Sequence, residues 1–360
     1  MIERVGVVGA GTMGAAIAQL CAQSGFSVKV HDPAAQVLAL LPGRLKSGLD
    51  AAVLKGRLST QQAQRAFHGV SAAQDLSDLA GADLVIEAAP EQLALKQELF
   101  EKLSRICPHG LLATNTSSLS VREIMKKSKA PQRTLGVHFF NPPVAMKLVE
   151  MIRTPETDPD AFRAAWDFIL AGLRKTPVEV KDSPGFIVNR VMRPYYVSAQ
   201  SLADSQTGFE SIDESCRRLG GVPMGPFELM DLIGLDVNFA ITRAIYEAMG
   251  RPERFSPPGL QAVMVDRGWI GKKSGRGFYQ YADGKKEAEN PEALKALPAA
   301  RGGAPPEPWT TLSGAIAEEA RRLVSEGAAG ACDIDTAVKL AMNFPKGPFE
   351  WQKENTAARP

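Results

Sequence analysis

Residues 4–32, RVGVVGAGTMGAAIAQLCAQSGFSVKVHD, decide the fold of this chain. They contain an apolar strand at 4–8, a glycine-rich turn, a helix through 15–23 and a second strand at 26–30. Asp32 follows that second strand. This order of elements is typical of the first unit of a dinucleotide-binding, doubly wound sheet. A lone glycine pattern would be a weak signal, but this setting disfavours the alternative of a plain tight turn before a helix.

The glycine-rich turn supplies the predicted cofactor contacts Gly9, Ala10, Gly11, Thr12, Met13 and Gly14. Gly9 permits the tight turn, Gly11 lets the backbone approach a pyrophosphate, and Gly14 lets the helix pack closely on the strand. The first N–H groups of the helix then face the phosphates. Asp32 is placed to accept hydrogen bonds from the adenosine ribose and to repel a 2′-phosphate, which favours NAD over NADP.

A second informative segment spans 134–152, TLGVHFFNPPVAMKLVEMI. Its two apolar runs, separated by Asn-Pro-Pro, predict two strands, because neither proline fits inside a central strand. His138 lies late in the first run and Glu150 late in the second, so neighbouring strands can bring them together. A carboxylate on one imidazole nitrogen leaves the other as a base with a pKa near neutrality. The alternative for this pair alone is a half-buried histidine beside an unrelated surface glutamate.

Further strands are predicted at 82–88 and 111–114, in a chain that is otherwise helical over 34–80. Ser117 comes just past the second of these strands, at the edge where open α/β sheets bind ligands. An ordinary turn or capping serine is the alternative. The 34–80 segment carries a basic cluster that includes Lys55, which indicates either a solvated face or a landing site for phosphates.

The predicted fold class is α/β, with a Rossmann-type doubly wound sheet followed by an all-α C-terminal domain and a partial helical repeat. In the repeat, Asp213 and Gly225 recur as Asp335 and Gly347, each before Pro-Phe-Glu. The segment before the repeat is charged and then rich in Pro, Gly and Ala, which is typical of a linker. The expected boundaries are 1–182 for the NAD-binding domain, 183–282 for the helical domain, 283–308 for the linker and 309–355 for the repeat.

Composition adds several expected absences. The 360 residues carry a formal net charge of +2, so no overall field indicates nucleic acid or a membrane surface as a partner. The four cysteines lack CxxC spacing and the four histidines form no ligand pattern, so we expect reduced cysteines and no metal. No apolar run reaches membrane-spanning length and nothing resembles a signal peptide, which predicts a cytoplasmic protein.

Seven segments, in order, resemble the L-3-hydroxyacyl-CoA dehydrogenases: GAGTMG, VIEAAPE, TNTSSL, GVHFFNPPVAMKLVE, DSPGFIVNR, GVPMGPFELMDLIGLD and GKKSGRGFYQY. The resemblance covers residues 1 to about 281. It implies NAD as cofactor and an acyl-CoA substrate. The implied reaction is oxidation of an L-3-hydroxyacyl-CoA to the 3-ketoacyl-CoA, or its reverse.

The resemblance also implies roles for individual residues. His138 and Glu150 would form the catalytic dyad, and Ser117 and Asn189 would complete the catalytic set by hydrogen-bonding the substrate. Further cofactor contacts would come from Glu91, Lys96, Ser117, Asn141 and Lys273. Lys55 would contact coenzyme A. The chain departs from the family at Gly48, where relatives can place a serine on the coenzyme A phosphates.

Other expectations concern assembly and alternative functions. The resemblance implies a homodimer through the helical domain, and the repeat is expected to dock on a helical domain without adding a catalytic residue. A related L-gulonate 3-dehydrogenase of the lambda-crystallin type shares the site motifs and is an alternative. A non-catalytic NAD-binding or structural protein is another. The sequence leaves the acyl-chain length open.

Overall fold

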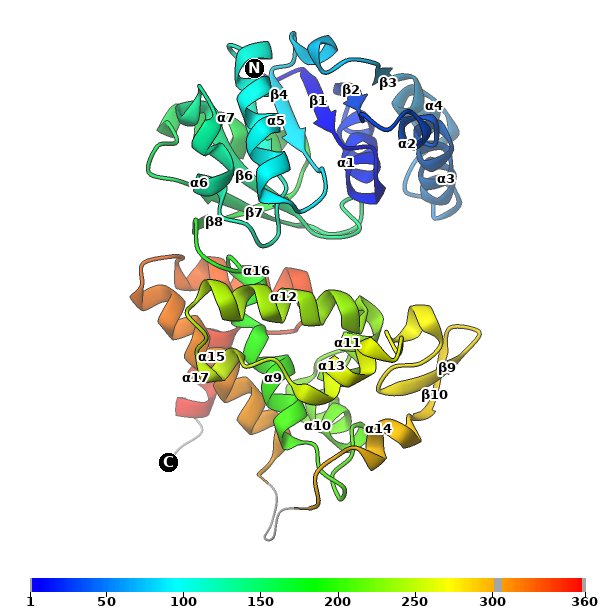
Figure 1. Ribbon diagram of the computed structural model, residues 1–360, viewed down its shortest axis with the longest axis vertical. Coiled ribbons are helices and arrows are strands. Elements are labelled where there is room, and N and C mark those ends of the chain that lie inside the picture. Colours follow the sequence, from blue (N-terminus) through cyan, green and yellow to red (C-terminus); the bar gives the residue numbers. More distant parts are fainter. Residues whose placement is uncertain (1, 301–305, 358–360) are drawn as a thin grey trace. The chain divides into compact units, whose positions relative to one another are not determined.

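We describe a computed structural model that covers residues 2–300 and 306–357. Two compact units make up the chain, divided between Ser183 and Pro184. The first unit is a sheet flanked by helices and the second is largely helical (Figure 1). Each unit has its own architecture.

The first unit is built on an eight-stranded sheet with the order β3-β2-β1-β4-β5-β6-β7-β8. The six strands from β3 to β6 run parallel, while β7 is antiparallel to β6 and parallel to β8. Their bounds are β1 Arg4–Val8, β2 Ser27–His31, β3 Val70–Ala73, β4 Leu84–Glu87, β5 Leu111–Thr114, β6 Thr134–Phe139, β7 Leu148–Arg153 and β8 Thr176–Lys181.

Both faces of this sheet are covered. On β1, Val5 and Val7 belong to one apolar cluster and Val8 to the other, so alternate side chains bury on opposite faces. Helix side chains such as Ile17 fill the first cluster and Phe100 the second. Burial on both faces explains the nearly continuous apolar strands. The flanking helices are α1 Thr12–Gln23, α2 Ala35–Ala39, α3 Leu41–Leu54, α4 Thr60–His68, α5 Leu93–Ile106, α6 Val121–Ile124 and α7 Pro159–Asp167.

Two first-unit expectations need correction. The segment predicted as helical over 34–80 contains the edge strand β3, whose sequence VSAA has only one buried residue, Ala73. Such an edge strand lacks the apolar pattern by which strands are recognised. Helix α1 begins at Thr12 rather than at Ala15, directly after the Gly11 N-cap position.

The second unit contains α8 Val188–Val191, α9 Arg193–Leu202, α10 Glu210–Gly220, α11 Pro226–Ile233, α12 Leu235–Ala248, α13 Gly259–Asp266, α14 Pro291–Lys295, α15 Pro308–Ser325, α16 Ala331–Met342 and α17 Pro348–Ala357. It is not entirely helical, because β9 Tyr279–Ala282 and β10 Lys285–Glu289 form a hairpin. The hairpin lies at the right edge of this unit in Figure 1. The domain thus departs slightly from the all-α expectation.

The predicted linker 283–308 is partly ordered structure, since it holds β10 and α14. Its charged residues make specific contacts: Glu289 accepts hydrogen bonds from the backbone N–H groups of Phe209 (2.6 Å) and Glu210 (2.9 Å) at the start of α10. Asn290 is buried and donates to the Gly277 carbonyl at 2.8 Å. The amino-acid composition of the segment gives no indication of these long-range contacts. Residues 301–305 of this segment lie outside the described residues.

The repeat packs on the helical domain of its own chain, with α15 against α9 and α10. Its internal geometry reproduces that of the first copy. Asp213 accepts from the Phe227 N–H (3.0 Å) at the start of α11, as Asp335 does from the Phe349 N–H (2.9 Å) at the start of α17. The equivalent glycines share a steric requirement, because a Cβ on Gly225 would lie 2.3 Å from Asp213 Cα and one on Gly347 would lie 2.4 Å from Asp335 Cα.

Candidate active site

His138 and Glu150 face each other across the antiparallel strands β6 and β7. The distance from His138 Nδ1 to Glu150 Oε2 is 2.7 Å, and the two side chains are 8% and 0% exposed. The carboxylate acceptor places the imidazole proton on Nδ1, so Nε2 is the basic nitrogen. The predicted strands therefore bring the two groups together as directly opposed partners. Because every residue of β6 and all but the last of β7 are buried, the register of the pair is strongly specified.

A buried lysine holds the connection between these two strands. Lys175 Nζ donates to the carbonyls of Pro143 (2.6 Å) and Met146 (2.7 Å). Burial lowers the pKa of the Lys175 ammonium to about 8. Sequence reasoning missed this residue, whose only signal is a lysine placed directly before a buried strand. Asn141, which precedes a cis peptide bond to Pro142, is exposed in the same connection.

The glycine-rich turn has the steric properties expected of a phosphate-binding loop. Gly9 has φ of 102°, and a Cβ there would lie 2.6 Å from the Ala88 carbonyl oxygen. A Cβ on Gly14 would lie 1.8 Å from the Gly9 carbonyl oxygen, so the helix packs directly on the turn. A Cβ on Gly11 would meet no atom within 4 Å, which leaves this backbone open to a ligand. The turn thus fits a dinucleotide pyrophosphate at the N-terminus of α1.

Asp32 lies beside the same turn. Its Oδ2 accepts from the Ala10 N–H at 2.8 Å and its Oδ1 from the Ala34 N–H at 2.9 Å. Each carboxylate oxygen can accept more than one hydrogen bond, so the predicted ribose contact is compatible with these two. Arg44, a member of the basic cluster noted in 34–80, donates from Nη1 to the Ala10 carbonyl. The backbone of Ala10 is therefore held from both sides.

Glu91 organises the turn that carries Ser117. Its Oε1 accepts from Thr116 Oγ1 (2.5 Å), from the backbone N–H groups of Ser117 (3.0 Å) and Ser118 (3.1 Å), and from Ser118 Oγ (2.9 Å). Burial opposes ionisation of this carboxyl, but the Lys96 ammonium and these hydrogen bonds outweigh it and lower the pKa of Glu91. The Ser117 turn is thus fixed by an ionised carboxylate.

Lys96 is only 1% exposed and lies beneath Glu91. Its Nζ contacts Glu87 Oε1 (2.6 Å), the Ala89 carbonyl (3.2 Å) and Glu91 Oε2 (3.3 Å). Glu87 is fully buried and also accepts from Thr114 Oγ1 at 2.7 Å. All three ammonium hydrogens therefore have protein acceptors. This geometry fits a role for Lys96 in orienting Glu91 better than it fits the direct cofactor contact that the resemblance implies.

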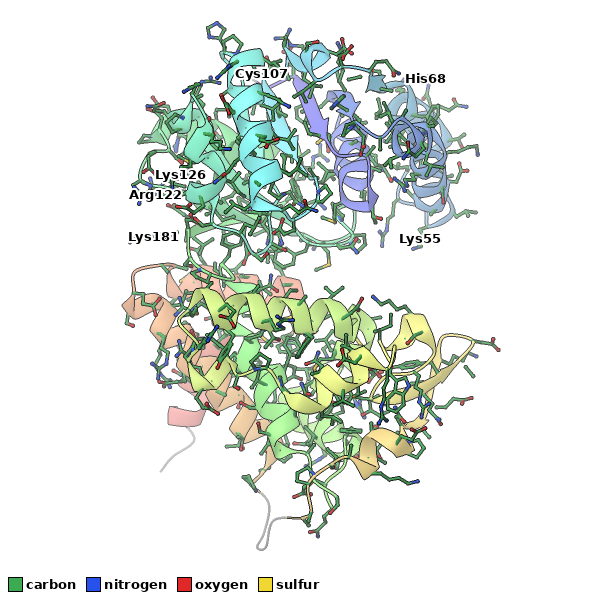
Figure 2. The ribbon with its side chains drawn as sticks, viewed as in Figure 1. Lys55, His68, Cys107, Arg122, Lys126 and Lys181 are labelled. Carbon is green, nitrogen blue, oxygen red and sulfur yellow. The ribbon has the colours of Figure 1, made fainter. Side chains whose placement is uncertain are left out.

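The remaining predicted residues are divided between the two units. Lys55 is exposed at the end of α3, as Figure 2 shows. Asn189 and Lys273 belong to the second unit. Asn189 is partly exposed in α8, and the Lys273 ammonium pairs with Asp236 Oδ1 at 2.7 Å.

The departure at Gly48 has a structural counterpart in Gln19. A Cβ on Gly48 would lie 2.1 Å from Gln19 Oε1, so the glutamine fills the space that a serine side chain would need. Gln19 is buried, and its Nε2 has no hydrogen-bond partner among the described residues. Both residues, with Arg44, line a pocket of about 550 Å³ between α1 and α3.

Comparisons with known proteins agree with this geometry. The family model for the NAD binding domain of 3-hydroxyacyl-CoA dehydrogenase matches residues 4–183. The model for the C-terminal domain of the same enzymes matches 185–281 and again 310–357. The chain belongs to the 3-hydroxyacyl-CoA dehydrogenase family. The predicted family, fold class and NAD cofactor are confirmed, and the divided C-terminal match coincides with the internal repeat.

Two curated relatives and one solved structure illustrate membership of the 3-hydroxyacyl-CoA dehydrogenase family. The 3-hydroxyadipyl-CoA dehydrogenase of Escherichia coli is 41% identical over 82% of this chain, which spans 62% of that relative's length. The 3-hydroxybutyryl-CoA dehydrogenase of Mycobacterium tuberculosis is 40% identical over 78% of this chain and 99% of its own. A crystal structure of 3-hydroxybutyryl-CoA dehydrogenase from Escherichia coli superposes with a TM-score of 0.87 at 32% identity, covering 99% of this chain and 92% of that one.

The described helices include none that is both long and apolar enough to span a bilayer.

Proposed function

We propose that this member of the 3-hydroxyacyl-CoA dehydrogenase family oxidises an L-3-hydroxyacyl-CoA to the 3-ketoacyl-CoA with NAD, or catalyses the reverse reaction. The observation that carries the proposal is the buried His138–Glu150 pair, with its 2.7 Å contact near the carboxyl end of β6. The Ser117 turn follows β5, the parallel neighbour of β6. A hydrogen bond of 2.9 Å from the Phe139 N–H to Asn115 Oδ1 links the ends of the two strands.

In the proposed mechanism His138 Nε2 takes the proton of the substrate's 3-hydroxyl. Glu150, at Nδ1, stabilises the imidazolium that forms. Ser117 and Asn189 are proposed to hydrogen-bond the same substrate oxygen, which positions it and opposes charge build-up as the carbonyl forms. NAD, when bound, supplies the acceptor for the hydride that leaves C3.

For the cofactor, we propose that the glycine-rich turn holds the pyrophosphate and that Asp32 binds the adenosine ribose. Glu91, Asn141 and Lys273 are proposed to contact the ribose or the nicotinamide side. Lys96 is proposed to act through Glu91, because its ammonium already has three acceptors in the protein.

For the substrate, the activities named for the two curated relatives favour a short 3-hydroxyacyl-CoA over a free sugar acid such as L-gulonate. Lys55 is proposed to contact coenzyme A from the end of α3. The deciding experiment follows NADH formation and compares kcat/KM for 3-hydroxybutyryl-, longer-chain and 3-hydroxyadipyl-CoA with that for gulonate. Turnover of gulonate alone would replace the proposed substrate, and no turnover of any of them would favour the non-catalytic alternative.

We also propose a cytoplasmic location and a homodimer through the helical domain. Because α15 of the repeat already packs against α9 and α10, such a dimer would use another face of that domain. Light scattering of the purified protein tests the proposed dimer, and a monomeric mass would reject it.

A further inference from the structure

The repeat meets the first helical copy through a buried ion-pair cluster. Arg190 of α8 donates from Nε to Glu319 of α15 at 2.8 Å. Its two terminal nitrogens each contact one carboxylate oxygen of Glu326 at 2.6 Å. Arg254 also pairs with Glu319, at 2.7 Å. A bidentate contact of this kind fixes the plane of the guanidinium as well as its position.

The central pair of this cluster is buried, while its outer partners reach solvent. The side chains of Arg190 and Glu319 are each 1% exposed, whereas Glu326 is 48% exposed. Burial alone would lower the pKa of Arg190, but the two carboxylates raise it and keep the guanidinium charged. A buried guanidinium that loses a carboxylate partner is strongly destabilised, so its side chain would move toward water.

Arg190 directly follows Asn189, the proposed substrate contact, and a second buried arginine lies one turn further on. Arg193 donates from Nε to the Asn189 carbonyl at 3.2 Å. Its Nη1 reaches the Asn238 carbonyl (3.1 Å) and Thr242 Oγ1 (3.0 Å) on α12. The backbone around Asn189 is thus anchored to α12 through one arginine and to α15 through the other.

Helix α8 has no side-chain N-cap, and only Met192 separates its four residues from α9. The two arginines therefore hold the backbone at the N-terminal end of this helical stretch, and the position of Asn189 depends in part on them.

We propose that the C-terminal repeat positions the substrate-binding Asn189, with Glu319 and Glu326 acting as positioning residues through Arg190. The inference rests on the proposed function, which assigns Asn189 to the substrate. It assigns the repeat a role in turnover although the repeat supplies no group that touches the substrate.

The test compares Glu319→Gln and Glu326→Gln with Glu318→Gln in the full-length protein. Glu318 lies on the same helix, but its partners Arg321 and Arg322 are about half exposed, so it is the matched control. We expect the first two variants to lower kcat/KM for the acyl-CoA at least tenfold, with an unchanged KM for NAD. Glu318→Gln should change neither. Glu326→Gln leaves the Arg190–Glu319 pair in place and serves if Glu319→Gln does not fold.

A double-mutant cycle with Asn189→Ala separates positioning from plain stabilisation. If Glu319 acts through Asn189, Glu319→Gln should cost little further kcat/KM in the Asn189→Ala background. If the fold losses in kcat/KM of the two single variants multiply in the double variant, the proposal is overturned, while the role of Asn189 stands. An Asn189→Ala variant with unchanged kcat/KM would remove the assignment of Asn189, and the proposal with it.

Discussion

At the scale of single residues, the proposed chemistry depends on one imidazole and the carboxylate opposite it. His138→Ala removes the base, and we expect kcat to fall by at least about a hundredfold, the usual effect of losing a general base. Glu150→Gln should lower kcat by a comparable factor, because a neutral amide does not stabilise the imidazolium as a carboxylate does. Steady-state kinetics and an NADH-binding titration measure both effects, and NADH affinity should stay nearly unchanged. Near-normal turnover in either variant would contradict the assignment.

Asp32 is the residue at which cofactor choice is decided. We expect kcat/KM with NAD to exceed that with NADP by well over tenfold, because a 2′-phosphate beside this carboxylate meets a like charge. Asp32→Asn removes the charge. It should lower the ratio of kcat/KM with NAD to kcat/KM with NADP, mainly by raising the value with NADP. Parallel assays with both cofactors give the ratio. Equal efficiency with NADP in the natural protein would refute the ribose assignment.

Some single residues were within reach of sequence reasoning and others were not. His138 and Glu150 lie at matching positions in two recognisable strands, and the glycine spacing of 9–14 follows directly from the needs of a phosphate loop. The family resemblance implies a cofactor contact for Lys96, yet its side chain is buried and pairs with Glu91. A lysine on an amphipathic helix is normally solvated, and only the fold shows that two carboxylates, Glu87 and Glu91, converge on this one.

At the scale of elements, the sheet was largely predictable because its strands are buried on both faces. The exceptions are elements whose sequence carries no periodic pattern. Strand β3 lies at an edge with one buried residue, and β10 (KKEAE) is charged at every position but one. Their positions follow from contacts with distant segments, such as that of Glu289 with the start of α10. Local sequence does not contain that information.

The connection between β6 and β7 gives a prediction at this scale. Lys175→Met removes the donor to the Pro143 and Met146 carbonyls, and we expect a loss of about 1–3 kcal/mol in the free energy of unfolding. Because the connection carries Asn141, KM for NAD should rise more than KM for the acyl-CoA. Denaturant unfolding and kinetics measure the two effects, and Lys147→Met, an exposed residue of the same connection, is the control. Equal effects in both variants would contradict the role of Lys175.

Lys175 also predicts a pH dependence. Burial lowers its pKa in the folded protein to about 8, from 10.5. Between these values the unfolded chain binds more protons than the folded one, so this residue makes the folded state more stable as pH rises from 8 to 10.5. Below pH 8 both states are protonated and its contribution is constant. The difference in free energy of unfolding between the natural protein and Lys175→Met should therefore change over that pH window. A difference that does not vary with pH would contradict a lowered pKa for Lys175.

At the scale of the whole molecule, the repeat is part of the helical unit and not an appendage. A Cβ on Gly220 of α10 would lie 2.8 Å from the Trp309 ring of α15, which shows how closely the copies pack. Ending the chain at residue 300 should lower the melting temperature markedly and also lower kcat/KM for the acyl-CoA, because Arg190 then loses Glu319 and Glu326. Calorimetry and kinetics on the shortened chain measure both. A shortened chain with an unchanged melting temperature would contradict the packing role.

The contact between Gln19 and Gly48 couples these two positions as they change over generations. A side chain at 48 needs the space that the glutamine carboxamide occupies, so its arrival makes the flexible end of Gln19 move aside. A lineage that first shortens residue 19 opens that space before anything enters it. A lineage that first enlarges residue 48 has to re-orient the Gln19 side chain in the same step. The effect of a substitution at either position therefore depends on the residue at the other.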